Sequence, residues 1–142
     1  MRSHRSAVAL LFAIAVIAAA CGGRAESEEA AAPGGLRRVS AQEAAAIVDD
    51  PPADLVILDV RTAEEFAEGH VDGAIMIDFY GEDFADQIAA LDPDVPYVLY
   101  CRSGNRSGQT IALMQELGFT DVADVDGGVL QWGSAGLPLV NS

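Results

Sequence analysis

From residue 37 onward, the chain alternates short apolar runs with stretches that have helical spacing. Residues 55–58 (Leu-Val-Ile-Leu) and 97–100 (Tyr-Val-Leu-Tyr) are apolar at every position, which is typical of strands buried on both faces of a sheet. Residues 74–77 and 122–125 are shorter apolar runs of the same kind. The pattern therefore predicts four short strands.

Helix signals fill the segments between these runs. Ser40-Ala-Gln-Glu43 and Thr62-Ala-Glu-Glu65 are capping boxes, in which a hydroxyl and a carboxylate satisfy the free N–H groups of a helix start. The first box predicts a helix to about residue 48, ended by Asp-Asp-Pro-Pro, and the second predicts a short helix that ends at a glycine. Further helices are predicted over residues 81–91 and 107–117, with a last helical turn at 129–132.

Strands that alternate with helices predict an α/β domain with three layers, in which helices flank a mostly parallel central sheet. Ligands of such sheets bind beyond the carboxyl ends of the strands. Asp59 directly follows the predicted strand 55–58, and Cys101 directly follows the strand 97–100. We therefore expect these two residues at the same edge of the sheet.

The first twenty residues have the layout of a secretory signal peptide, with a basic start and an apolar run from Ala7 to Ala20. This run is shorter than the ~20 residues that a spanning helix needs. Because Cys21 follows three alanines, the segment resembles a bacterial lipoprotein signal, which implies that Cys21 is lipidated and holds the protein to a membrane. An ordinary signal peptide with an incidental cysteine and an uncleaved anchor are the alternatives, and all three export the domain.

Residues 21–36 are small and acidic, without apolar periodicity, which predicts a flexible acidic tether. The predicted organisation is a signal peptide over 1–20, the tether over 21–36 and one folded domain over 37–142. We expect the domain in the periplasm or outside the cell, attached to the membrane only through the lipid.

The chain of 142 residues is strongly acidic, with 22 Asp and Glu against 8 Arg and a formal net charge of -14. Removal of residues 1–20 takes away two arginines, so the mature charge becomes -14 - 2 = -16. Nucleic acids and anionic lipid surfaces need a basic footprint, so the composition excludes them as partners. A well-solvated surface or adaptation to a salty medium accounts for the acidity.

The turn from Cys101 to Arg106 carries the candidate chemistry. A tight turn between a buried strand and a helix points N–H groups inward and forms an anion-binding nest. The helix start adds partial positive charge, and the guanidinium groups of Arg102 and Arg106 add full charges. These groups favour a thiolate, because cationic neighbours and helix N-termini lower a cysteine pKa from about 8.5 to roughly 3.5–7.5. We therefore predict that Cys101 is a nucleophile.

Other roles for these residues are weaker. His70 is the single histidine after the signal segment and lies at the predicted end of a helix, where capping of carbonyls is favoured over pairing with Cys101. A buried structural thiol is the alternative for Cys101, but the polar residues around it make a poor apolar pocket. No second cysteine or histidine has metal-ligand spacing, so no metal site is predicted.

Four motifs in order resemble the rhodanese family. The first is Leu58-Asp59-Val60-Arg61 with Glu65-Phe66, and the second is Gly69-His70-Val71-Asp72-Gly73-Ala74. The third is the loop Cys101-Arg102-Ser103-Gly104-Asn105-Arg106-Ser107. The fourth is Gly127-Gly128-Val129-Leu130-Gln131-Trp132 with Ala135-Gly136-Leu137-Pro138. Together they span about residues 37–140.

The resemblance implies a sulfurtransferase that needs no cofactor. Cys101 would take a sulfane sulfur from thiosulfate or a similar donor as a persulfide and pass it to cyanide, a thiol or a protein acceptor. The backbone of residues 102–106, which are Arg102, Ser103, Gly104, Asn105 and Arg106, would hold the anionic sulfur, while the two arginine side chains orient the donor. Asp59 and Arg61 would brace the site or serve only the structure.

Two other functions remain open. Phosphatases and arsenate reductases of related fold use a loop one residue longer, to fit a phosphate group. The segment from Cys101 to Arg106 spans six residues, the length that suits sulfur. The second alternative is a sulfur carrier or sensor module with little turnover of its own.

Overall fold

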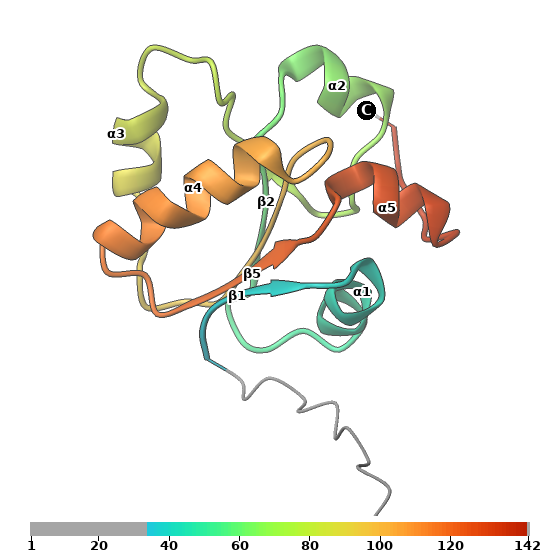
Figure 1. The fold of residues 1–142 in the computed structure, drawn as a ribbon, viewed down its shortest axis with the longest axis horizontal. Helices are drawn as coiled ribbons and strands as arrows, with labels where there is room; N and C mark the ends of the chain where they lie inside the picture. The colour runs from blue at the N-terminus through green and yellow to red at the C-terminus, as the bar shows by residue number, and fades with distance from the viewer. Residues whose placement is uncertain (1–33, 142) are drawn as a thin grey trace, which may run out of the picture. The chain divides into compact units, whose positions relative to one another are not determined.

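The computed structural model describes residues 34–141. The predicted signal peptide, Cys21 and most of the predicted tether lie outside the described residues. Strands and helices alternate along the rest of the chain (Figure 1). The five strands are β1 (Gly35–Val39), β2 (Val56–Asp59), β3 (Ile75–Met76), β4 (Tyr97–Tyr100) and β5 (Asp121–Val125). The five helices are α1 (Ala41–Asp49), α2 (Ala63–Glu68), α3 (Phe84–Ala89), α4 (Asn105–Glu116) and α5 (Gly128–Ser134).

All paired strands are parallel, and their order in the sheet is β1-β5-β4-β2-β3. Helices α1 and α5 pack on one face of the sheet, while α3 and α4 pack together on the other. The predicted three-layer α/β fold with a mostly parallel sheet is therefore confirmed.

Two of the helices begin at the predicted capping boxes. The hydroxyl of Ser40 accepts from the Glu43 N–H at 3.2 Å, and the Glu43 carboxylate accepts from the Ser40 N–H at 2.7 Å. Thr62 and Glu65 form the same pair of bonds at the start of α2. Local sequence alone therefore determines where α1 and α2 begin.

Strand β1 is missing from the sequence prediction, and its first two residues, Gly35 and Leu36, belong to the segment predicted as tether. Its half-exposed sequence contains two arginines rather than an apolar run. Long-range ion pairs hold it at the sheet edge: Arg37 pairs with Asp121 of β5 at 2.5 Å, and Arg38 pairs with Asp124 at 3.2 Å. Such pairs cannot be recognised in a local pattern, which is why the strand was missed.

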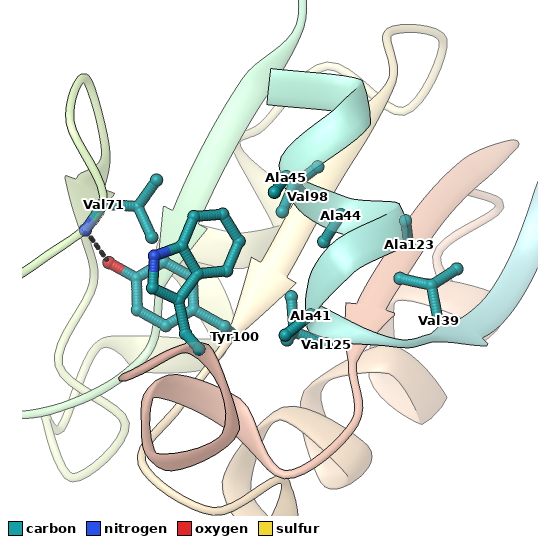
Figure 2. Packing of buried hydrophobic residues seen from close by; sticks show 10 residues of the cluster. Val39, Ala41, Ala44, Ala45, Val71, Val98, Tyr100, Ala123 and Val125 are labelled. Atoms are coloured by element: carbon teal, nitrogen blue, oxygen red, sulfur yellow. Dashed lines mark hydrogen bonds between the residues drawn. The ribbon is translucent and has the colours of Figure 1, made fainter. Parts of the chain in front are cut away.

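The sheet separates two buried apolar clusters. The cluster between the sheet and helices α1 and α5 is drawn in Figure 2, where small alanines of α1 lie against β4 and β5. Tyr100 is fully buried there, and its hydroxyl accepts from the Val71 N–H at 3.1 Å (Figure 2). The second cluster lies under α3 and α4 and includes the apolar atoms of Cys101. Within residues 34–141, no helix is long and apolar enough to cross a membrane.

Candidate active site

The carboxyl ends of β2 and β4 lie side by side. Asp59 is in register with Tyr100, and the Val60 N–H donates to the Tyr100 carbonyl at 3.1 Å. Cys101 follows Tyr100 directly. The expectation that Asp59 and Cys101 occupy the same sheet edge is therefore confirmed.

The turn after β4 wraps around the sulfur of Cys101. The Gly104 N–H donates to Cys101 Sγ at 3.1 Å, which requires the left-handed backbone of Gly104 (φ 91°). Helix α4 begins at the next residue, Asn105, two positions before its predicted start. The Asn105 side chain accepts from Gln109 at 2.9 Å and so lies along the helix rather than against the sulfur.

Opposing effects act on the Cys101 thiol. Burial raises its pKa, but the N–H groups of Ser103, Gly104 and Ser107, together with the Ser107 hydroxyl, lower the pKa by more. The net result is a pKa below the ordinary thiol value. The charge of Arg106 and a charge on this sulfur attract each other, which is one of the effects that raise the pKa of Arg106. The surroundings of Cys101 thus favour an anion on Sγ.

Cys101 is nevertheless 0% exposed, as the buried-thiol interpretation required. The structure combines the buried thiol and the polar nucleophile. Cys101 belongs to an apolar cluster, while its sulfur accepts a hydrogen bond from the turn. Helix α5 closes the turn from outside: Val129 N–H donates to the Cys101 carbonyl at 2.9 Å, and Leu130 N–H donates to the Arg102 carbonyl at 3.1 Å.

Gly128 allows this close approach of α5. Its φ is +56°, and a Cβ there would overlap the Cys101 carbonyl oxygen and lie 2.7 Å from the Arg102 carbonyl oxygen. In the sequence analysis, Gly127 and Gly128 appear only as the start of the fourth motif. The structure places Gly128 directly against the turn that holds the candidate nucleophile.

The side chain of Arg106 forms an ion pair with Glu65. Its two terminal nitrogens donate to both carboxylate oxygens of Glu65 at 2.8 and 2.7 Å. Hydrogen bonds from Arg106 lower the pKa of Glu65 to about 2. The ring of Tyr80 lies 5.6 Å from the guanidinium carbon. Glu65 therefore belongs to the site, although sequence reasoning used it only as a helix cap and a motif residue.

Arg102 differs from Arg106 because its side chain is exposed. Within the described part of the chain, it forms no ion pair. It lines a cavity of about 240 Å³ beside the turn, whose other lining residues include Leu130, Leu139 and the acidic Glu65 and Glu68. Of the two arginines predicted to orient a donor, Arg102 is thus the one with a free guanidinium in this structure.

Asp59 and Arg61 bind each other rather than the turn. Asp59 is 0% exposed and Arg61 is 4% exposed, and they form an ion pair at 2.6 Å. The same Arg61 nitrogen donates to the Gly69 carbonyl at 2.7 Å, and the guanidinium lies over the Tyr100 ring. This pair fastens the end of α2 to the sheet, which agrees with the structural interpretation of these two residues.

His70 has a structural role as well. Its Nδ1–H donates to the Phe66 carbonyl at 2.9 Å, and its ring stacks on the Phe66 ring with centroids 3.7 Å apart. Its backbone pairs with Val140. The predicted capping of helix carbonyls by His70 is confirmed.

Two buried polar side chains received no role in the sequence analysis, although Ser107 ends the third motif. Ser107 lies in the first turn of α4, and Asp124 lies in β5. The Ser107 hydroxyl lowers the pKa of both the Cys101 thiol and the Asp124 carboxyl. Sequence patterns offered no signal for Asp124, because its approach to α4 depends on sheet order. Among residues 34–141, no three His, Cys, Asp or Glu side chains are grouped as metal ligands.

Comparison with known proteins identifies the family. A sequence-family model described as "Rhodanese-like domain" matches residues 40–135, more than half of the chain. The chain belongs to the rhodanese-like domain family. The resemblance seen in its four motifs is thereby confirmed, and the turn at Cys101 is the turn of a rhodanese-like domain.

Curated relatives of this rhodanese-like chain carry sulfurtransferase names. Thiosulfate sulfurtransferase GlpE of Pseudomonas aeruginosa is 41% identical over 78 residues, which are 55% of this chain and 69% of that protein. A protein named sulfurtransferase from Allochromatium vinosum is 34% identical over 87 residues, covering 61% of this chain and 79% of that protein.

A solved structure supports the same fold. The rhodanese-related protein of Thermoplasma volcanium has a TM-score of 0.65 and 26% identity, and the match covers 75% of this chain and 99% of that one.

Proposed function

We propose that this protein is a sulfurtransferase that carries a sulfane sulfur as a persulfide on Cys101. One observation supports the proposal above the others: the Cys101 sulfur faces N–H groups of a six-residue turn that lower the thiol pKa despite burial. Family membership and the sulfurtransferase names of its relatives point to the same chemistry.

The reaction has two displacement steps. The Cys101 thiolate attacks the outer sulfur of thiosulfate, a new S–S bond forms, and the old one breaks so that sulfite leaves with the electron pair. The negative charge then lies on the outer sulfur of the persulfide. An acceptor such as cyanide or a thiolate attacks that sulfur, the Cys101 thiolate leaves, and thiocyanate or a new persulfide is released.

The described side chains suggest how a donor is held. Arg102 is exposed beside the turn and can meet the sulfonate group of thiosulfate. Arg106 contributes positive charge near the sulfur while its hydrogen bonds go to Glu65. Since Cys101 is 0% exposed, the exposed part of the turn, Arg102 and Ser103, must shift to admit the donor.

The test is sulfur transfer from thiosulfate to cyanide by the full-length protein. We expect Cys101→Ser to reduce the rate by at least about 1,000-fold, because loss of a nucleophile removes the whole covalent pathway. Circular dichroism checks that the variant is folded. After exposure to thiosulfate, mass spectrometry should find one added sulfur atom on the peptide that contains Cys101. A Cys101→Ser variant that keeps its rate, or phosphate release from an aryl phosphate without sulfur chemistry, contradicts the proposal.

A sulfur carrier with little turnover is the second candidate, and the complete burial of Cys101 favours it. Both candidates predict the added sulfur atom, but only the enzyme predicts repeated turnover. Measurement of thiocyanate formed per molecule of protein separates them: one equivalent or less indicates a carrier, and many equivalents indicate an enzyme.

We also propose that the domain is exported and held to a membrane by a lipid on Cys21. The support is the sequence of residues 1–21 alone. In a bacterial host, the full chain should fractionate with membranes, and Cys21→Ser should move to the soluble fraction. Cys101→Ser is the matched control and should stay with the membranes. The same distribution for both variants contradicts lipidation at Cys21.

A further inference from the structure

Two buried oxygen atoms near Cys101 lack hydrogen-bond partners within the described residues. They are the hydroxyl oxygen of Ser107 and Oδ1 of Asp124. Ser107 is 0% exposed and Asp124 is 1% exposed. An unsatisfied buried polar group destabilises a protein, and a charged one does so more strongly, so these two atoms call for an explanation.

The sheet order brings these groups together. Asp124 shares a face of β5 with Val122, and this face packs under α4, which carries Ser107 in its first turn. Asp124 Oδ2 accepts from Arg38 of β1 at 3.2 Å, which leaves Oδ1 without a bond. The Ser107 hydroxyl lowers the pKa of both Asp124 and Cys101, although it holds no fixed hydrogen bond to either group. The unpaired hydroxyl thus lies in the same buried layer, between the sheet and α4, as two groups that can each be negative.

We propose that Asp124 is a positioning residue that controls the ionisation of Cys101 by competing with it for the Ser107 hydroxyl. A hydroxyl has a single hydrogen to donate. When that hydrogen is directed at the Asp124 carboxylate, the Cys101 thiolate loses one of its donors. The inference deepens the proposed function, on which it rests for the role of the thiolate.

The competition favours the sulfur-loaded state. In the free protein, the negative charge is on Sγ, next to the Ser107 hydroxyl. In a persulfide, the charge lies on the outer sulfur, about 2 Å further along the S–S bond. The Ser107 hydroxyl can then donate to Asp124, because Sγ no longer carries a charge that needs this hydrogen bond. Asp124 therefore raises the free energy of the free thiolate relative to the persulfide, with no proton or bond transferred.

Other charged and polar groups also influence the pKa values of Asp124 and Cys101. Burial raises the pKa of Asp124, and the nearby Asp126 adds to this, while the Ser107 hydroxyl and Arg38 of β1 lower the pKa, so that the net shift is upward. On the other side, the charge of Arg106 acts on Cys101, the Gly104 N–H donates to its sulfur, and the Ser103 N–H lowers the pKa of the thiol. These groups stay in place when only Asp124 or Ser107 is changed.

The test measures the rate at which iodoacetamide modifies Cys101 as a function of pH. The full-length protein is used, and the Cys101 peptide is followed by mass spectrometry so that Cys21 does not interfere. In Asp124→Asn, the side-chain carbonyl can accept from Arg38 while the amide donates to the Ser107 oxygen, which leaves the hydroxyl hydrogen for the thiolate. We expect the pH midpoint to fall by about one unit, the value of one hydrogen bond to a charged group.

Variants of Ser107 show whether the hydroxyl transmits this effect. Ser107→Ala should raise the midpoint by about one unit, and Ser107→Thr, which keeps a hydroxyl, should restore it. In the Ser107→Ala background, Asp124→Asn should no longer shift the midpoint. Ser107→Gly supplies the same background if circular dichroism shows that Ser107→Ala is unfolded.

An equal shift from Asp124→Asn with and without the Ser107 hydroxyl would mean a direct charge effect and would overturn the inference, as would the absence of a shift in the otherwise unchanged protein. Alkylation needs no sulfur donor. Failure of sulfur transfer with intact midpoint shifts therefore counts against the proposed function alone, while persulfide formation without the shifts counts against the role of Asp124 alone.

Discussion

The turns after β2 and β4 begin at the same edge of the sheet. Charged groups are paired with each other in the first turn and remain available to a ligand in the second. At the end of β2 and in the turn that follows, Asp59 and Arg61 neutralise each other, and Arg61 also donates to the Gly69 carbonyl. The turn after β4 directs N–H groups at the Cys101 sulfur and leaves the Arg102 guanidinium exposed. Both turns follow a strand of the parallel sheet and lead into a helix.

The difference shows that position in the fold does not by itself make a residue reactive. In the β2 turn, each charge has a partner a few residues away, so nothing remains to bind a ligand. In the β4 turn, the converging donors have only the sulfur to stabilise. The β4 turn can therefore offer hydrogen-bond donors and positive charge to a substrate anion. In the β2 turn, the corresponding groups are already paired within the protein.

The largest expected effect is on stability, from Arg61→Leu. The substitution leaves the fully buried Asp59 carboxylate without its ion-pair partner, which typically costs about 3–5 kcal/mol. Arg102→Leu, in the other turn, is the matched control and should change stability by less than about 0.5 kcal/mol. Urea unfolding measures both. Similar losses for the two variants would remove the distinction between the turns.

Next in size is Gly128→Ala, which tests the support that α5 gives to the β4 turn. The added methyl group would overlap the Cys101 carbonyl and displace the turn. A displacement near 1 Å can cost about 100-fold in rate, so we expect a loss of that order in sulfur transfer. Gly133→Ala, on the same helix with open space around it, should keep the parent rate. Equal rates for the two variants would contradict the role of Gly128.

A smaller effect is expected from the ion pair between Glu65 of α2 and Arg106 of α4, the two helices that follow these turns. Because the folded-state pKa of Glu65 is about 2, below its ordinary value, the pair stabilises the protein above about pH 4.5 and loses this contribution as pH falls toward 2. The pair is partly exposed, so we expect about 1 kcal/mol. Thermal unfolding should show a larger acid-induced loss in the parent than in Glu65→Gln. The exposed neighbour Glu64→Gln should behave like the parent.

The smallest effect is expected from Arg102→Ala on substrate affinity. An exposed charge contributes about 0.2–1 kcal/mol, so KM for thiosulfate should rise about 2- to 5-fold while kcat changes less. Added salt should reduce the difference because it screens exposed charges. Steady-state kinetics at two salt concentrations measure this. A salt-independent fall in kcat would instead assign Arg102 to the chemical step.

The elements predicted correctly are those that depend on nearby residues. The capping boxes at Ser40 and Thr62 located two helix starts, and the continuous apolar runs located β2 and β4. Strand β1 was missed because its arginines are held by β5, which is more than eighty residues away. Helix α3 proved shorter than predicted, since residues 81–83 form a turn before Phe84.

The candidate site divides in the same way. The position of Cys101 and the inward N–H groups could be predicted from one segment, because a strand, a glycine turn and a helix follow each other directly. Glu65, Gly128 and Asp124 reach the site from three other segments. Their roles depend on strand order and on the approach of α5, which a sequence pattern does not contain. The prediction that Arg106 orients a donor stays open, since Glu65 occupies its side chain here.

The direction of β1 has a practical consequence. Because β1 is parallel to β4, its first residue, Gly35, lies at the amino-terminal ends of the strands. Cys101 follows the carboxyl end of β4, roughly one strand length or 15 Å away along the strand direction. A bead, fusion partner or solid support joined ahead of Gly34 would therefore meet the domain at the end remote from its reactive sulfur. Immobilisation at this terminus should preserve access for large acceptors, whereas coupling beside α5 would obstruct it.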